Sequence, residues 1–139
     1  MSKYAGSLYY SFGIAADLSA SQWRGVIING NEQVAARATV TILSGAVAGI
    51  LQNAPNTSTQ MARVCMLGSS KLELGDSIAA GASFLFNTIG VGIPVNATTA
   101  GAQILGGIAL EGYTGASVTG GLIEAFLRID RAVDSVTVS

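Results

Sequence analysis

Leu-Ile-Glu-Ala-Phe-Leu-Arg-Ile, residues 122–129, is the stretch that decides the fold class. Its odd-numbered positions are all apolar, and from residue 124 they alternate with Glu124, Phe126, Arg128 and, just after the stretch, Asp130. A period of two is typical of a β-strand with one face on the core and the other in solvent. We therefore predict a strand here, with Phe126 exposed as a candidate contact for a partner.

Short apolar runs of this kind recur along the chain, separated by clusters of Gly, Asn, Ser or Thr that favour turns. Asn29-Gly30-Asn31 is a turn that tolerates left-handed backbone, and Gly68-Ser69 is interpreted as a break between two strands. Helical spacing is weak, and only residues 18–22 predict a single turn, capped by Asp17 or Ser19. The predicted strands are residues 8–14, 25–28, 33–40, 46–51, 62–67, 70–74, 83–86, 92–95, 103–110 and 122–129. Many short strands at near-regular spacing predict an all-β protein, a small β-barrel or sandwich.

Two local segments have a structural interpretation. Residues 75–81 begin and end in glycine, so they predict a tight reversal in which Asp76 accepts bonds from nearby backbone N–H groups. Ile78 is then expected in the core. Cys65, the single cysteine, stands in an apolar run and is expected to be a buried small hydrophobe.

The composition favours a surface that partners cover. Of 139 residues, 50% are hydrophobic and only 11% are charged, against about 25% charged in an ordinary soluble domain. Because a monomer in water usually carries more charge, we expect a homo-oligomer. A neutral monomeric β domain is the alternative. The length favours one domain, or one domain with an arm, and we predict an N-terminal arm, residues 1–16, followed by a single β-barrel domain, residues 17–139.

The first sixteen residues carry four aromatics separated by Gly, Ser and Ala. Such side chains bury a large area, so an arm that becomes ordered on a neighbouring subunit would use them as anchors. A strand packed on its own barrel is an equally good interpretation. Trp23 is either a further anchor or a core tryptophan. The candidate protein-interface residues are Tyr4, Tyr9, Tyr10, Phe12, Trp23 and Phe126.

Catalytic and metal chemistry lack their usual residues. The chain has no histidine and one cysteine, which excludes a Ser-His-Asp arrangement and a thiolate metal cage within one chain. Two carboxylate pairs are close in sequence, Glu73 with Asp76 and Asp130 with Asp134, but neither matches a calcium loop. The glycine-rich stretch 101–106 lacks the lysine of a phosphate-binding loop. We expect no enzyme, no cofactor, no metal and no small-molecule substrate.

Nucleic acid and membranes are not expected as partners. The seven basic residues are scattered, so no stripe matches a phosphate backbone. The uncharged stretches 38–62 and 77–110 contain Asn, Gln, Pro and Gly, and neither supplies about 20 apolar residues for a spanning helix. The first residues do not resemble a signal peptide.

A set of short motifs adds a family resemblance. Gly49-Ile-Leu-Gln-Asn-Ala-Pro55 is followed by Ala62-Arg-Val64 and Gly68-Ser-Ser-Lys-Leu72, then by Ile78-Ala-Ala-Gly81 and Ile104-Leu-Gly-Gly-Ile-Ala-Leu-Glu111. In this order and spacing, the set resembles the small capsid decoration (cement) proteins of tailed phages. The match covers most of the chain, from near residue 17 to near residue 128. Residues 56–60 and 101–106 depart from the pattern, and residues 4–12 lie outside it.

The resemblance implies a compact β-barrel subunit that forms trimers on the outside of an icosahedral head. Its partners would be itself and the major capsid protein, its place the outer surface of the virion, and its site of synthesis the host cytoplasm. The alternative is a carbohydrate- or receptor-binding β domain, which requires exposed aromatics beside polar loop residues. Only Tyr113 offers such a loop aromatic in the sequence.

Overall fold

The computed structural model describes residues 7–36, 47–87, 89–95, 105–114 and 120–129. These residues form nine strands and no helix, so the predicted all-β class is confirmed. These residues therefore contain no helix that could span a membrane. The strands are β1 (Leu8–Ile14), β2 (Gly25–Ile28), β3 (Gln33–Ala36), β4 (Val47–Leu51), β5 (Ala62–Glu73), β6 (Ser83–Phe86), β7 (Gly92–Pro94), β8 (Leu105–Ala109) and β9 (Leu122–Arg128).

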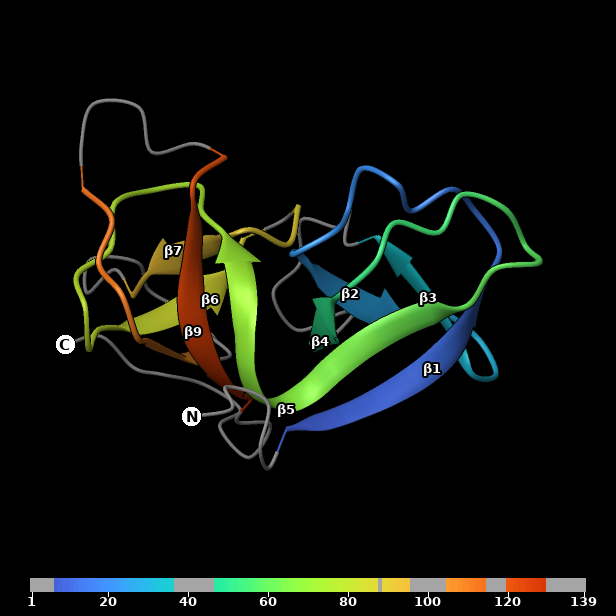
Figure 1. The fold of residues 1–139 in the computed structure, drawn as a ribbon, viewed down its shortest axis with the longest axis horizontal. Helices are drawn as coiled ribbons and strands as arrows, with labels where there is room; N and C mark the ends of the chain where they lie inside the picture. The colour runs from blue at the N-terminus through green and yellow to red at the C-terminus, as the bar shows by residue number, and fades with distance from the viewer. Residues whose placement is uncertain (1–6, 37–46, 88, 96–104, 115–119, 130–139) are drawn as a thin grey trace, which may run out of the picture.

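Five strands close into a small barrel (Figure 1). The order is β1-β3-β2-β4-β5, and antiparallel pairing of β1 with β5 completes the ring. Only β1 and β3 run parallel within it. Its interior is filled by buried apolar side chains, because alternate residues of each strand point inward. They include Phe12, Val26, Val34, Leu51 and Val64.

The remaining strands form a second sheet on the far half of β5, in the order β5-β9-β8-β6-β7. An isolated parallel bridge between Leu74 and Gly92 brings β7 back to the end of β5. Phe84 and Phe86 pack edge to face in the core of this sheet, with ring centroids 5.5 Å apart. Figure 1 shows β5 sweeping from the barrel into the second sheet, so one strand serves both.

The two cores lie back to back on β4. All five residues of β4 are buried, which is unusual for a barrel strand with one face in solvent. Leu51 belongs to the barrel core, whereas Val47 and Ile50 belong to the core of the second sheet. Cys65 of β5 also packs in the second core and is buried, as predicted.

The strand predicted at residues 122–129 is present, with one face buried and the other exposed. Ile123, Ala125 and Leu127 are buried, and Phe126 is 41% exposed. The turn at Asn29-Gly30-Asn31 is also confirmed, since Gly30 has φ of 104° and the Asn29 N–H donates to the Gln33 carbonyl at 2.8 Å.

One strand boundary was predicted wrongly. Gly68-Ser69 does not separate two strands, because residues 62–73 form the single strand β5. Gly68 has φ of 113°, a conformation that glycine adopts without steric cost, so the chain changes course without leaving the sheet. Ser7 lies where a side chain at position 68 would project.

The predicted reversal at residues 75–81 is present. The Ser77 N–H donates to Asp76 Oδ1 at 2.7 Å, and Ile78 is 2% exposed. Near residues 18–22, a single turn is closed by the Ser21 N–H and the Leu18 carbonyl, with the Asp17 carboxylate accepting from the Ser19 N–H.

Residues 8–14 pack on their own barrel as β1, which is the second of the two interpretations given for the N-terminal segment. The boundary between arm and domain at residue 16 stays a prediction. The predicted strand residues 37–40, 46, 103 and 104 lie outside the described residues, as do residues 1–6.

Candidate functional site

The predicted interface residues have different environments. Phe12 is 5% exposed in the barrel core, so its ring is committed to the fold. Tyr10 and Phe126 are exposed, at 46% and 41%, and Tyr9 and Trp23 are half-buried. Tyr4 lies outside the described residues. The structure brings Tyr10 together with Phe12, and places Trp23 and Phe126 on other strands and loops.

Tyr10 lines a shallow hollow of about 280 Å3 together with Phe12, Ile28, Glu32 and Met66. Its ring centroid is 4.8 Å from that of Phe12. The hydroxyl donates to Glu32 Oε1 at 2.8 Å. This hydrogen bond, together with the negative charge of Glu32, raises the pKa of Tyr10 above its ordinary value.

Phe126 belongs to an apolar part of the outer surface. It lies opposite Ile108 across β8 and β9, and both side chains are exposed, at 41% and 47%. Leu8 lies opposite Leu67 across β1 and β5, again with both exposed. Apolar pairs that face each other across two strands are normally covered by other residues. Because these pairs are exposed, the surface that they form is a candidate contact region for a partner.

Hydrogen bonds of its backbone hold Trp23 in place, and its side chain does not fill a pocket in the core. It has φ of 68°, which is rare for a bulky residue. Its N–H donates to the Leu51 carbonyl at 2.7 Å, and its carbonyl accepts from the Glu73 N–H at 2.9 Å. The Lys71 ammonium lies 5.5 Å from the centre of its ring. Trp23 therefore joins the ends of β4 and β5 at the surface.

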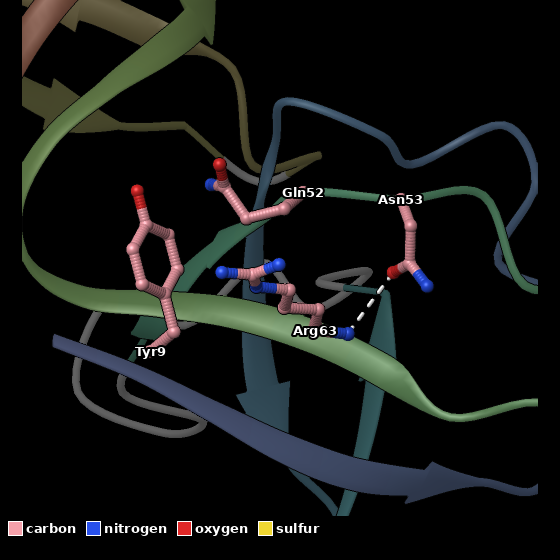
Figure 2. Close-up of a pocket in the computed structure, with 4 residues that line it drawn as sticks. All are labelled: Tyr9, Gln52, Asn53 and Arg63. Atoms are coloured by element: carbon pink, nitrogen blue, oxygen red, sulfur yellow. Dashed lines mark hydrogen bonds between the residues drawn. The ribbon is translucent and has the colours of Figure 1, made fainter. Parts of the chain in front are cut away.

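A groove of about 660 Å3 lies beside the barrel, lined by Tyr9, Gln52, Asn53 and Arg63 (Figure 2). Tyr9 comes from β1, Arg63 from β5, and the two amides follow the end of β4. The Arg63 guanidinium carbon lies 4.4 Å from the centre of the Tyr9 ring, a favourable cation–π distance. Figure 2 shows the guanidinium pointing toward the Tyr9 ring.

Hydrogen bonds fix the walls of this groove. Asn53 Oδ1 accepts from the Arg63 N–H at 3.0 Å, and Asn53 Nδ2 donates to the Met61 carbonyl at 2.9 Å. The Gln52 N–H donates to the Arg63 carbonyl at 2.8 Å. Gln52 Nε2 donates to Ser70 Oγ at 2.8 Å, so the Gln52 side chain is also held.

Of the groove residues named above, the sequence interpretation selected Tyr9 but not the other three. Gln52, Asn53 and Arg63 belong to the motifs of the family resemblance, but only as structural positions. No spacing rule connects them with Tyr9, because β1 meets β5 across more than fifty residues of chain. The pairing of β1 with the strand that contains Arg63 brings these residues together, and that pairing leaves no local signal in the sequence.

The described part of the chain contains no recognisable metal-binding or nucleophilic site. No group of three or more metal-binding side chains occurs there. Glu73, one of the paired carboxylates, forms a two-point ion pair with Arg24 at 3.2 and 3.0 Å. Burial raises the pKa of the Cys65 thiol, which keeps it protonated and poorly nucleophilic. Asp130 and Asp134 lie outside the described residues.

No protein-family model matches the chain, and no curated protein matches it in sequence. The expected membership of the decoration-protein family is therefore not confirmed. Among solved structures, the fold is similar to that in "The crystal structure of head fiber gp8.5 N base in bacteriophage phi29", with a TM-score of 0.55. The two chains are 15% identical, and the likeness covers 88% of this chain and 94% of the other. The chain thus has the fold of this head-fibre base over nearly the whole length of both.

Proposed function

We propose that this chain is a structural protein of a bacteriophage virion. The observation that carries the proposal is the fold shared with the phi29 head-fibre base over 88% and 94% of the two chains. The ordered motifs in residues 49–111 support it independently, because they resemble those of phage decoration proteins. The proposal includes no catalysis and no cofactor.

More specifically, the protein decorates the outer surface of the capsid as a homotrimer and stabilises the shell. The facing apolar pairs Ile108–Phe126 and Leu8–Leu67 support a partner-covered surface in a chain with few charges. A specific contact buries about 800 Å2 on each partner. Three linked contacts strengthen binding by about 10²–10⁴ over one, so a modest contact with the major capsid protein in each subunit is sufficient.

A carbohydrate- or receptor-binding role has less support. Tyr113 is exposed, but its backbone N–H and carbonyl bond to Ile78 at the corner of the second sheet, which is a structural role. Tyr9 does lie beside Asn53 and Arg63, yet the Arg63 guanidinium covers its ring. A sugar needs an open aromatic face.

The test uses the full chain and purified phage heads that lack it. Light scattering of the chain alone is expected to give the mass of a trimer, and its addition is expected to raise the temperature at which heads release DNA. Phe126→Ser should weaken trimer formation or head binding by at least about tenfold. Met61→Ser, which changes a side chain that is 53% exposed at another place, is the matched control. A stable monomer that binds no heads would contradict the proposal.

A further inference from the structure

Within the part of the chain that the structure describes, Arg63 has no carboxylate partner. Among the described residues, the one ion pair is that of Arg24 with Glu73, and no carboxylate lies within ion-pair distance of the Arg63 guanidinium. Arg63 is an exposed residue at the wall of a groove of about 660 Å3. We infer that this groove binds the carboxylate of an aspartate or glutamate side chain from a protein partner, to which the Arg63 guanidinium donates. This inference rests on the proposed function as a structural protein of the virion.

The chemistry of the guanidinium selects a carboxylate. Its N–H groups form a rigid planar fork that matches the two oxygens of a carboxylate. The protein uses this match internally, because Arg24 donates to both carboxylate oxygens of Glu73, at 3.2 and 3.0 Å. Arg63 offers the same fork toward the groove, without an internal acceptor among the described residues.

The site is already organised for binding. Asn53 accepts from the Arg63 N–H and Gln52 donates to the Arg63 carbonyl, so the backbone is held on both sides. The Tyr9 ring, 4.4 Å from the guanidinium carbon, restrains the side chain. A side chain that is fixed before binding loses less conformational entropy when it binds, and more of the interaction free energy becomes affinity.

The contacts of Tyr9 favour a protein carboxylate over an acidic sugar. The ring is partly buried and packs against the core of the second sheet, and Arg63 lies over it. No open aromatic face is left for a sugar ring. An extended aspartate or glutamate side chain needs no such face, since it reaches the guanidinium through the open groove.

Nuclear magnetic resonance of the labelled full chain tests this inference without phage heads. Hexaglutamate is the probe, and hexaglutamine is the uncharged control. We expect saturable shifts of the Arg63 Nε–H and Tyr9 ring signals with hexaglutamate only, with an affinity that falls as salt is added. Arg63→Gln should weaken binding by about fivefold to tenfold, whereas Arg128→Gln, which removes the same charge from another exposed position, should change it by less than about twofold.

Equal binding by the Arg63→Gln and Arg128→Gln variants would overturn the inference, as would the absence of shifts at Arg63. A tighter response to methyl glucuronide than to hexaglutamate would overturn the choice of a protein carboxylate. Binding to heads is measured separately. If the wild-type chain binds no heads, the proposed function fails while the peptide result still decides the groove. If heads bind the wild type and the Arg63→Gln variant equally, only the inference fails.

Discussion

At the scale of single residues, the aromatic side chains of β1 differ in their burial. Phe12 is buried in the barrel core, and Tyr10, on the same strand, keeps its ring partly in solvent while its hydroxyl bonds to Glu32. The sequence alone treated both as equivalent anchors. Burial separates them, because a ring inside the barrel is unavailable to a partner.

The hydrogen bond of Tyr10 predicts an effect at alkaline pH. The hydroxyl donates to the Glu32 carboxylate, so deprotonation breaks the bond and places two negative charges together, which raises the tyrosine pKa above 10.0. Because the folded-state pKa is raised, this contribution to stability is present below about pH 10 and is lost as the pH rises through the folded-state value. The difference between absorbance titrations of the wild type and of the Tyr10→Phe variant should show the midpoint of Tyr10.

The control for this titration is Glu32→Gln, which keeps a hydrogen-bond acceptor but removes the charge. The midpoint of Tyr10 should then move back toward about 10. A midpoint that is the same with Glu32 and with Gln at this position would contradict the assigned cause.

At the scale of strands, close approach explains the composition of β4. A side chain at Gly49 would meet the backbone carbonyl of Cys65 and the side chain of Val64 on β5. Since β4 has a core on each side, neither strand has room to move away.

We therefore expect Gly49→Ala to lower the free energy of unfolding by about 3 kcal/mol, as overpacking of a tight core does. Gly13→Ala is the matched control, because Gly13 also lies in a barrel strand but has more space around it. The nearest atom to the new methyl group would be Gln33 Cγ, at 3.6 Å. That change should cost less than about 1 kcal/mol. Urea unfolding of both variants gives the comparison, and equal losses would contradict the packing of β4 on β5.

Most strands could be predicted because their local pattern and their turns agree. Residues 122–129 alternate, and Asn29-Gly30-Asn31 suits a left-handed turn, so both elements have their predicted positions. The single strand β5 could not be predicted, since Gly68 is as suitable for a bend within a strand as for a loop between two. The groove depends on the pairing of β1 with β5 and on the course of the chain after β4, which are long-range contacts without a local signature.

At the scale of the whole molecule, β1 closes the barrel. It pairs with β3 on one side and β5 on the other, and Phe12 fills the interior. Residues 8–14 are therefore part of the barrel, and the N-terminal segment cannot detach as a whole.

Deleting residues 1–13 is expected to unfold the barrel rather than to yield a folded protein without an arm. The loss of the Phe12 ring alone costs about 3–5 kcal/mol, and the open edges of β3 and β5 add to this. Circular dichroism and thermal melting measure the result. Deletion of residues 1–6, which leaves β1 in place, is the control and should keep the melting temperature of the intact chain; a folded protein without residues 1–13 would contradict the role of β1.

The sharing of β5 has a mechanical consequence. A load applied to the second sheet reaches the barrel through one continuous peptide backbone and the hydrogen-bonded strands on either side of it, with no linker between them to stretch. We therefore expect the barrel and the second sheet to resist an applied load as one unit. A protein that holds neighbouring parts of a pressurised shell would benefit from this stiffness, because any slack within the subunit would let those parts separate before it resisted.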